Sequence, residues 1–569
     1  MLTTNKYLEE LYKFIEKDYL KTLFPLCSVK LISRYCLSEI LESFEKEFFI
    51  SDSQKSLSFL MQQLVYAAKD SKHVRQTLLL DPFAQIFIYD FVLRNRENFI
   101  NKINEFRQSF GYTFYEDSDD YNFPSEEFRK FSEKKLEMTR KFQYLGKLDI
   151  ANCFNNIYHH DIVSFISMII DPAESEKIGK FLREINGGRS TGCMPQGIFP
   201  AKVIGNFFLS FIEGSREIKS DVIIRFMDDI YLFSDDNETI ANDFLTIQKL
   251  IGEKGLYLNE EKSEIKHVDT GEEVNEIEEL KKSLLQKRRI IINAYTGEPE
   301  DFEEAEITED EMNYLKVKLH EKELDDGDLE LILAVLSIDL LEFLELFDLV
   351  LQKSPHLTKN LYLSIKRNLM YIDEDIIKSI ENLINNKFVI QEFQLFWLTK
   401  ILIDFTEMNE HIVDLLFKIY KHQSATNPVK SLILEIQENN FGLLELKKSV
   451  VRGHSHELVI SGLIGLISLE KGNRNQIYKY VGKSNPLLRI LTLSLKKLNG
   501  DEMSTILDTT ISKWSYTKTM HPGVKTTDVD DKLPWEMDQE IATALDNNNN
   551  SDIKFDDLFG DLSDEDLPF

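Results

Sequence analysis

The sequence predicts an α+β domain followed by an all-α domain. From residue 145 to about 268, short apolar runs alternate with helical patterns, and two of these runs flank a pair of aspartates. Residues 311–520 instead contain one amphipathic stretch after another, each about 12–18 residues long, with breaks at Asn, Gly, Ser or Pro. The 569 residues also exceed the roughly 250–300 at which a single core stops growing, so we expect at least two domains.

Composition excludes several classes of protein. An apolar content of 43%, with 39 Phe and 21 Tyr, is enough for packed cores and rules out bulk disorder. No apolar run approaches the ~18 residues of a membrane span, and the first residues, MLTTNKYLEELYKF, do not resemble an export signal. The four cysteines form no CxxC pair, which argues against a disulfide framework or a structural zinc. We therefore expect a cytoplasmic protein without a membrane partner.

The pattern changes several times along the chain. Residues 1–145 are predicted to be mostly helical, because apolar residues recur three and four positions apart, and the mixed domain is expected to span 1–275. Residues 276–310 combine a basic helix with an acidic linker, TGEPEDFEEAEITED. The region 311–520 is expected to form a HEAT-like α-helical repeat domain, with an irregular bundle as the alternative. Residues 521–569 lose all periodicity and are predicted to be a disordered acidic tail.

The net charge of −30 is unevenly distributed. Residues 521–569 hold fourteen acidic and three basic residues, so the tail carries more than a third of the excess. A basic run lies just before the acidic linker and consists of Lys281, Lys282, Lys287, Arg288 and Arg289. This run is either a contact for a phosphate backbone or a solvated helix face, and the sequence leaves both open.

The strongest local signal is RFMDDIYLF at residues 225–233. Asp228 and Asp229 stand between two apolar, β-prone runs, which places them in the tight turn of a hairpin. Neighbouring carboxylates repel each other, and ionising both beside apolar strands is costly unless a cation neutralises them. The pattern predicts a metal site, with a solvated hairpin turn as the alternative for this segment alone.

A third carboxylate, Asp149 in GKLDIANCFNNIYHHDI, follows a short apolar strand. A strand-end aspartate beside the hairpin pair would complete a set that holds two Mg²⁺ ions about 3.5–4 Å apart for phosphoryl transfer. Mg²⁺ is favoured because every ligand is a hard oxygen, with Mn²⁺ as a substitute. We interpret the nearby His159 and His160 as structural, because carboxylates suffice for such a site.

Four motifs follow one another in the sequence: LDIANCFNNIYHHDI, TGCMPQG, RFMDDIYLF and GLYLNEEKSEI. In order and spacing they resemble motifs A, B, C and D of reverse transcriptases, over roughly residues 70–268. The resemblance implies a fingers and palm fold, with dNTPs and nucleic acid as partners. It also implies that Asp149, Asp228 and Asp229 are the catalytic, metal-binding residues.

The same resemblance implies a nucleotide site built from motifs A and B. Phe154 matches the bulky residue that excludes a ribose 2′-hydroxyl, a task that an aromatic wall performs by steric exclusion. Pro195, Gln196 and Gly197 match the motif that positions the template and the incoming nucleotide. Gly197 would also allow a close approach of the backbone to a base or phosphate.

Basic residues complete the implied nucleotide site. Lys262 matches the motif D lysine near the triphosphate. In the fingers, HVRQTLLLDPFAQ resembles the segment whose basic residue grips the triphosphate, with Arg75 as the first candidate and Lys72 as the second. Such lysines and arginines supply the charge neutralisation that phosphoryl transfer needs.

The region after motif D indicates a subclass. The chain continues directly into the helical region, without a maturase, endonuclease, RNase H or integrase-like block, and this resembles the abortive-infection (AbiK/AbiA-like) antiphage reverse transcriptases. The phrase CFNNIYHHDI resembles a form shared with retron enzymes, but the long helical region favours the abortive-infection group. The MPQG sequence is closer to the general reverse transcriptase form and leaves template use open.

Three functions are compatible with the sequence. The first is an antiphage enzyme that polymerises dNTPs, untemplated and primed from one of its own tyrosines as the group allows, with Tyr7, Tyr12, Tyr19 and Tyr35 as candidate primers. The second is an RNA-templated enzyme that works with a dedicated noncoding RNA. The third is a polymerase-fold sensor or scaffold that acts through its helical repeats, against which the intact aspartates and Lys262 argue.

The C-terminal half carries two further expectations. Residues 311–520 are expected to pack against the palm, replace the usual thumb and enclose the product path, and the resemblance implies a homo-oligomer. The ending FDDLFGDLSDEDLPF resembles the terminal peptide of bacterial single-stranded DNA-binding proteins. Leu567, Pro568 and Phe569 are therefore candidate contacts for host proteins that bind such tails, with a merely solubilising tail as the alternative.

Overall fold

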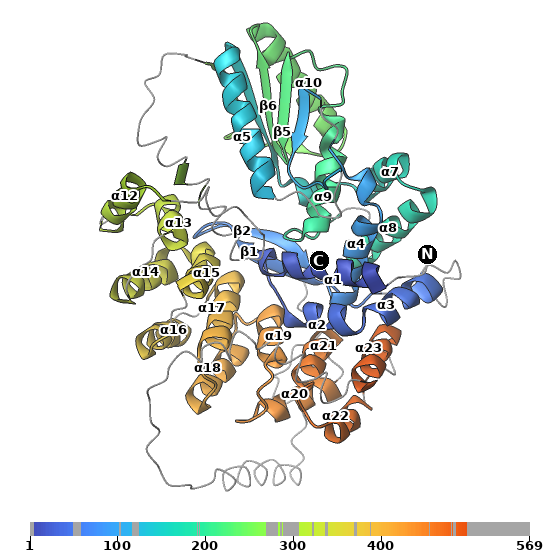
Figure 1. The fold of residues 1–569 in the computed structure, drawn as a ribbon, viewed down its shortest axis with the longest axis vertical. Coiled ribbons are helices and arrows are strands. Elements are labelled where there is room, and N and C mark those ends of the chain that lie inside the picture. The colour runs from blue at the N-terminus through green and yellow to red at the C-terminus, as the bar shows by residue number, and fades with distance from the viewer. Residues whose placement is uncertain are drawn as a thin grey trace, which may run out of the picture. The chain divides into compact units, whose positions relative to one another are not determined.

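The computed structural model describes most of the chain between residues 5 and 497. The described residues are 5–48, 59–101, 104–116, 124–189, 192, 194–268, 283–284, 287, 307–320, 324–335, 340–368, 372–386, 389–453, 456–479, 481 and 485–497. The predicted acidic tail with Leu567, Pro568 and Phe569, and most of the basic helix and linker, lie outside them. The predicted fold class is confirmed, since an α+β region is followed by a helical C-terminal region (Figure 1). No helix in the described ranges has the length and apolar character needed to cross a membrane.

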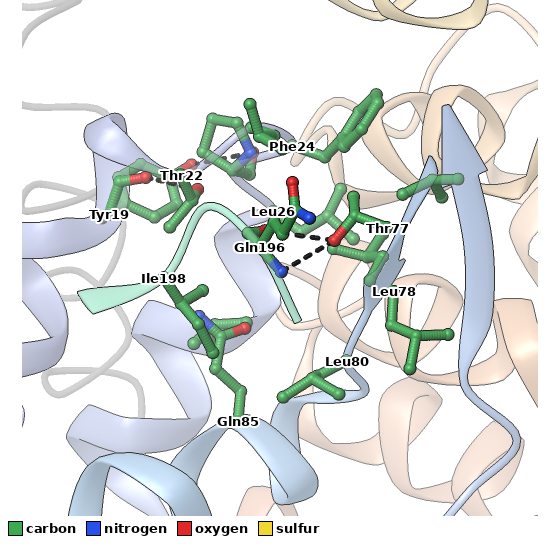
Figure 2. Close-up of a pocket in the computed structure, with 15 residues that line it drawn as sticks. Tyr19, Thr22, Phe24, Leu26, Thr77, Leu78, Leu80, Gln85, Gln196 and Ile198 are labelled. Carbon is green, nitrogen blue, oxygen red and sulfur yellow. Dashed lines mark hydrogen bonds between the residues drawn. The ribbon is translucent and has the colours of Figure 1, made fainter. Parts of the chain in front are cut away.

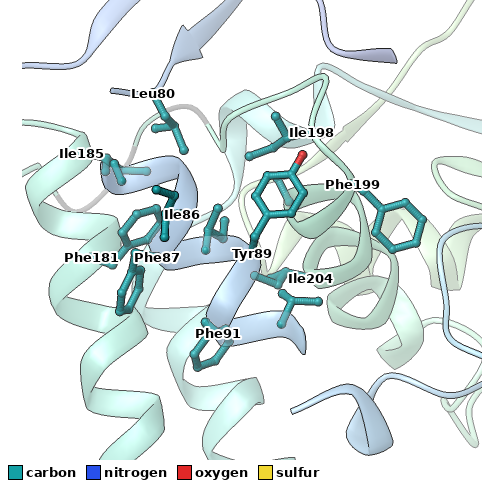
Figure 3. Packing of buried hydrophobic residues seen from close by; sticks show 14 of the residues in the cluster. Leu80, Ile86, Phe87, Tyr89, Phe91, Phe181, Ile185, Ile198, Phe199 and Ile204 are labelled. Atoms are coloured by element: carbon teal, nitrogen blue, oxygen red, sulfur yellow. The ribbon is translucent and has the colours of Figure 1, made fainter. Parts of the chain in front are cut away.

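Helices near the N-terminus form the centre of the first core. They are α1 (Asn5–Asp18), η1 (Tyr19–Lys21), α2 (Cys27–Tyr35), α3 (Leu37–Ser43), η2 (Phe44–Phe48), α4 (Pro82–Arg94) and η3 (Arg96–Asn98). The start of α4 is fixed by Asp81, whose side chain accepts hydrogen bonds from the N–H groups of Phe83 and Ala84. Every residue of α4 before its last is buried, and Figure 3 shows its aromatic side chains among those of neighbouring helices, with Phe87 stacked on Phe181. The helix α4 is therefore the central element of this core.

An antiparallel hairpin lies within the region that the sequence predicts as mostly helical. Its strands are β1 (Gln63–Ala68) and β2 (Val74–Leu79). Buried Val65 alternates with exposed Leu64 and Tyr66, which is the two-residue period of a strand. Because apolar Leu64 and Tyr66 occupy the exposed positions, the sequence itself does not show this period.

A sheet in the order β3-β5-β6-β4-β7, with β8 also paired to β4, forms the palm. The predicted central hairpin is confirmed as β5–β6, which is antiparallel, whereas β3 runs parallel to β5. The strands are β3 (Arg107–Phe110), β4 (Tyr144–Ala151), β5 (Val222–Phe226), β6 (Asp229–Ser234), β7 (Tyr257–Leu258) and β8 (Glu264–His267).

Helices cover both faces of this sheet. The helix α10 (Asn237–Gly252) packs on β4 and β6, and α5 (Pro124–Lys141) packs on the other face, against Tyr231 and Phe233. Figure 1 shows α5 running alongside β5 and β6. The other helices of this region are α6 (Cys153–Asn156), α7 (His159–Ile169), α8 (Pro172–Ile185), α9 (Phe199–Phe208) and η4 (Leu209–Phe211).

The C-terminal helices form two layers. In one layer α13, α15, α17, α19 and α21 pack successively on one another, and the other layer includes α14 on α16, α16 on α18, and α20 on α22. Their bounds are α12 (Glu309–Leu319), α13 (Asp326–Val335), α14 (Leu340–Lys353), η6 (Pro355–Leu357), α15 (Thr358–Asn368), α16 (Glu374–Asn386), α17 (Glu392–Phe405), α18 (Glu410–Lys421), α19 (Asn427–Glu435), α20 (Leu443–Arg452), α21 (His456–Gly465), α22 (Lys471–Tyr478) and α23 (Pro486–Lys497).

The helical region shares its cores with the N-terminal half. One core joins β1 and Phe24 to helices α12–α20, and the other joins α20–α23 to α2, α3 and the palm. Among the described residues its extensive contacts run to β1, α2 and α3. The sequence predicts direct packing against the palm, whereas the palm joins the same core on the other side of these N-terminal helices. The apolar side of β1 and the segment before α2 give the reason, because both need a cover that the palm does not supply.

Candidate active site

The three predicted aspartates lie where adjacent strands meet. The antiparallel register places Asp149 of β4 directly opposite Asp229, the first residue of β6. Asp228 is the second residue of the turn between β5 and β6, and its carbonyl accepts a 3.2 Å hydrogen bond from the N–H of Ile150. The turn is thus tied to the strand that carries the third aspartate. The structure brings the three predicted residues together.

The turn that presents Asp228 has an unusual backbone. Met227 adopts a φ of +56°, a conformation that non-glycine residues rarely take. A positive φ at the first turn position matches the twist of a two-residue hairpin. Gly111, itself at φ +117°, lies beside the Met227 side chain, 3.4 Å from its sulfur to where a β-carbon would be. The neighbouring chain therefore leaves room for this strained turn.

The carboxylates perturb one another electrostatically. Burial, followed by the charges of Asp229 and Asp149, raises the pKa of Asp228 to about 6. Burial and the charge of Asp149 also raise the pKa of Asp229. A cation would relieve this repulsion, and three carboxylates without a nitrogen or sulfur ligand suit a hard ion such as Mg²⁺. No group of three or more His, Cys, Asp and Glu side chains in the described ranges is gathered closely enough to count as a metal centre.

Basic side chains face the aspartates from several elements. The charges of Lys147, Lys262 and Lys135 each lower the pKa of Asp229, and Arg75 of β2 lowers that of Asp228. Arg75 is an exposed residue of the fingers hairpin and is near enough for its charge to act on Asp228. Lys72 lies in the β1–β2 turn, where its N–H donates to Asp70 Oδ1 at 2.8 Å.

The loop with Lys262 wraps around Asp149. The N–H of Asn259 donates to the carbonyl of Asp149 at 2.7 Å, and the hydroxyl of Ser263 accepts from the N–H of Asp149 at 3.1 Å. The N–H of Lys262 closes the turn on the carbonyl of Asn259. These bonds hold the exposed Lys262 on the aspartate side of the sheet.

Phe154 lies in α6, directly after β4. Its ring packs on α9, so closely that a β-carbon at Gly205 would lie 2.8 Å from the ring tip. The next residue, Asn155, links motif A to both other parts of the site. Its side chain donates to the carbonyl of Gln76 at 3.3 Å and accepts from the side-chain amide of Gln196 at 3.4 Å.

The loop before α9 is contacted by β2 on one side and by residues 22–26 on the other. The N–H of Gln196 donates to the Thr77 hydroxyl at 2.8 Å, as Figure 2 shows. Gly197 has a φ of +97°, and a β-carbon there would lie 2.8 Å from Leu23. A cavity of about 30 Å³ lies between this loop, β2 and residues 22–26 (Figure 2). Only glycine fits at position 197 without displacing Leu23.

Arg225 is a residue of the site that sequence reasoning missed. It is fully buried, and its guanidinium donates to both carboxylate oxygens of Glu213, at 2.8 and 2.7 Å. Two further bonds reach the side chain and carbonyl of Asn206 in α9, each at 2.9 Å. A fifth bond, also 2.9 Å, goes to the carbonyl of Met227 in the turn. Arg225 therefore connects the turn of Asp228 to α9.

His159 and His160 make their contacts with residues other than the three aspartates. Nε2 of His159 lies 3.4 Å from the side-chain amide of Asn186, and His160 pairs with Asp161 at 3.0 Å. These contacts agree with a structural role.

The four candidate primer tyrosines differ in their surroundings. The hydroxyl of Tyr7 donates to Asp90 at 2.7 Å, and burial raises its pKa. Burial raises the pKa of Tyr19 well above the usual value. Tyr12 donates to Glu16 at 2.8 Å, and burial together with this bond also raises its pKa. All four side chains, including Tyr35, are half-buried.

Comparison with known proteins agrees with this geometry. Residues 89–319 match the family model for reverse transcriptase (RNA-dependent DNA polymerase), and they span the three aspartates and the α9 loop. This segment is a reverse transcriptase domain. The protein is accordingly an enzyme of the nucleotidyltransferase class, an RNA-directed DNA polymerase by its domain. A comparison with curated proteins gave no significant match.

Two solved structures align with much of the chain at low similarity. One is telomerase from Candida albicans in complex with a TWJ fragment of telomeric RNA, 10% identical over 68% of this chain and 70% of that chain, with a TM-score of 0.28. The other is apo telomerase from Candida tropicalis, 11% identical over 68% and 73%, with a TM-score of 0.26.

Proposed function

We propose that the protein polymerises dNTPs by phosphoryl transfer at two divalent ions, preferably Mg²⁺, held by Asp149, Asp228 and Asp229. The observation that carries this proposal is the register of β4 and β6, which places Asp149 opposite Asp229 and next to the turn that holds Asp228. Burial, together with the neighbouring carboxylates, raises the pKa values of Asp228 and Asp229. Bound Mg²⁺ would supply neutralisation of carboxylate and phosphate charge, the main requirement of this reaction.

The surrounding residues suit the substrate. Arg75 of β2 and Lys262 of the loop after β7 carry charges that act on Asp228 and Asp229, and both would bind the triphosphate oxygens. The backbone at Gln196 and Gly197 would position the base and template, and Phe154 would exclude a ribose 2′-hydroxyl. The chain's part in catalysis is then to orient the two reacting oxygens and to offset negative charge.

We further propose that the enzyme belongs to the abortive-infection antiphage group and starts synthesis without a template from a tyrosine hydroxyl. The motif A phrase and the long helical region support this assignment. Tyr7, Tyr12, Tyr19 and Tyr35 all stay candidate primers, because all four are half-buried and burial raises the pKa of Tyr7, Tyr12 and Tyr19 alike. RNA-templated synthesis with a dedicated noncoding RNA is the second candidate, because the MPQG sequence leaves template use open.

The remaining expectations concern organisation. We propose fingers and palm over residues 1–275 and a HEAT-like repeat domain over 311–520, which the two-layer packing of alternate helices supports. A homo-oligomer and the recruitment of host proteins by the tail, through Leu567, Pro568 and Phe569, are proposals from the sequence alone.

Incubation of the purified full chain with labelled dNTPs and Mg²⁺ tests the polymerase proposal. One arm contains no nucleic acid and a second contains a primed RNA template; label that stays on the protein through denaturation indicates protein priming. The variant Asp228→Asn/Asp229→Asn should lose incorporation while folded. The neighbouring pair Asp235→Asn/Asp236→Asn is a matched control, because it lies at the other end of β6. Equal incorporation by both variants would refute the polymerase proposal.

A further inference from the structure

Residues 18–26, which we call the bridging segment, join the helical region to the loop before α9. The segment starts at the end of α1, includes η1 and stops at the start of α2. The segment contacts the helical region and the loop before α9 at the same time. Neither the motifs nor the family model assigns it a role, since the model match begins at residue 89.

On one side the segment contacts the end of the loop that leads into α9. Asp18 is buried, and its carboxylate accepts a 2.7 Å hydrogen bond from the N–H of Phe199, the first residue of α9. The residue before α9, Ile198, has no side chain able to cap the helix, so Asp18 performs this task from a distant part of the chain. Leu23 lies against Gly197, with its side chain and backbone N at 2.8 and 3.4 Å from where a β-carbon of residue 197 would be.

On the other side the helical region holds the segment. The ammonium group of Lys359 in α15 donates to the carbonyls of Lys21 and Thr22, at 3.1 and 3.0 Å. Phe24 packs edge to face between Phe393 and Phe396 of α17, with ring centroids 5.9 and 5.1 Å apart. These contacts are polar at one turn and aromatic at the next, so they fix both the position and the rotation of the segment.

The loop has supports on its other side as well. The N–H of Gln196 donates to the Thr77 hydroxyl, its side-chain amide donates to Asn155, and the N–H of Met194 donates to the carbonyl of Phe154 at 3.0 Å. A small cavity lies between β2, the segment and Gln196 (Figure 2). The fingers and motif A therefore hold one side of the loop, and Leu23 and Asp18 of the bridging segment hold the other.

We infer that the helical region positions the nucleotide-binding loop through the bridging segment, with Leu23 and Asp18 as positioning residues for Gln196 and Gly197. The inference rests on the proposed nucleotide role of that loop. Its structural half, that the segment restrains the loop, is independent of any activity. A disturbance in the helical region would reach the nucleotide site along this path.

Hydrogen exchange on the full-length protein tests the structural half. The probes are the amides of Gln196 and Phe199, which donate to Thr77 and Asp18. Leu23→Ala and Lys359→Met should speed their exchange roughly tenfold, and the volume-conserving Leu23→Met should restore protection. Leu250→Ala is the matched control, because Leu250 is a half-buried leucine of α10 that packs on a core outside the bridging segment and outside the helical region. Unchanged exchange in Leu23→Ala, or equal acceleration in Leu250→Ala, overturns the inference.

Steady-state kinetics test the functional half. Leu23→Ala and Lys359→Met should raise KM for dNTPs severalfold with little change in kcat, because binding geometry suffers and the aspartates do not. Leu250→Ala should leave both constants unchanged. Absence of incorporation by the wild-type protein would refute the proposed function, yet the exchange result would still decide whether the segment restrains the loop. A normal KM together with faster exchange would limit the role of the segment to structure and overturn the positioning role.

Discussion

Asp228 is held where its ionised form is unfavourable. Burial and two neighbouring carboxylates raise its pKa to about 6, above the value of about 4 for an exposed Asp. In the metal-free protein, the native state therefore retains a proton that the unfolded chain releases between pH 4 and 6. The free-energy cost that the Asp228 charge imposes on folding is therefore fully present above pH 6 and absent below pH 4.

We predict that Asp228→Asn stabilises the metal-free protein at pH 8 by about 1–3 kcal/mol, because it removes the unfavourable charge. The gain in Tm should shrink as the pH falls from 6 toward 4. Calorimetry in the presence of a chelator measures both values. A gain that grows as the pH falls would contradict the raised pKa.

Phe154 gives a prediction about substrate choice. Its ring is packed on Gly205, so the wall that it forms is rigid. We expect Phe154→Ala to increase the preference for ribonucleotides over dNTPs by roughly 10–100-fold in the ratio of kcat/KM values, because a steric block is removed. Phe165→Ala, which also loses packing on the core but lies in α7, should keep the wild-type ratio. An unchanged ratio for Phe154→Ala would remove the steric role.

The three aspartates of the site were predictable from the sequence, but the residues that hold the site in place were not. Asp149, Asp228 and Asp229 were predictable because carboxylates beside apolar strands are rare and demand an explanation. Arg225 lies inside an apolar strand pattern, and a single buried cation there gives no local sign of its partners. Leu23 meets Gly197 across more than 170 positions of sequence, and neither residue is distinctive alone. A contact between two residues of common types that lie far apart in the sequence leaves no local pattern from which it could be predicted.

At the scale of elements, the β5–β6 hairpin depends on Arg225. Its guanidinium binds Glu213, Asn206 and the carbonyl of Met227, so one side chain secures the turn against α9. A buried ion pair is often replaceable by apolar residues, whereas removal of one partner leaves an uncompensated charge that costs about 3–5 kcal/mol. A comparison of the single and the double substitution therefore separates the contribution of Arg225 to stability from its contribution to the position of the turn.

We predict that Arg225→Met lowers both Tm and activity, and that Arg225→Met/Glu213→Leu restores Tm but not activity. The double variant removes both charges yet still leaves the Met227 carbonyl without its donor. The Mg²⁺ concentration for half-maximal incorporation should rise roughly tenfold in the double variant, because the turn that aims Asp228 is loosened. Recovery of both properties would show that Arg225 matters for folding alone.

The elements themselves were predicted unevenly. The long amphipathic helices of the C-terminal half and the β5–β6 hairpin follow from period and turn residues. The β1–β2 hairpin was missed because it interrupts a helical region and one of its faces is covered by the helical region rather than by its own neighbours. Its partly apolar exposed face, with Leu64 and Tyr66, then obscures the alternation that marks a half-buried strand.

At the scale of the whole described chain, the two predicted domains share their cores. The core that includes α20–α23 continues into α2, α3 and the palm, and the core of α12–α20 includes β1 and Phe24. Glu435 of α19 is a polar link between the halves, accepting hydrogen bonds from the N–H of Cys27 at 2.6 Å and from the Ser461 hydroxyl at 3.0 Å. Shared cores of this kind couple the stability of the two halves.

We predict a single cooperative unfolding transition, and a shift of the whole transition when Glu435 is changed to Ala. The substitution leaves the buried N–H of Cys27 without an acceptor, at a cost of about 1–3 kcal/mol, which for a unit of this size lowers Tm by about 1–3 °C. Glu445→Ala is the control, because Glu445 is 60% exposed and its pairing with Lys448 at 3.5 Å contributes little. Calorimetry of the full chain follows both variants. Two separate transitions, of which Glu435→Ala moves only one, would mean that the halves fold independently and that the helical region cannot hold the bridging segment in place.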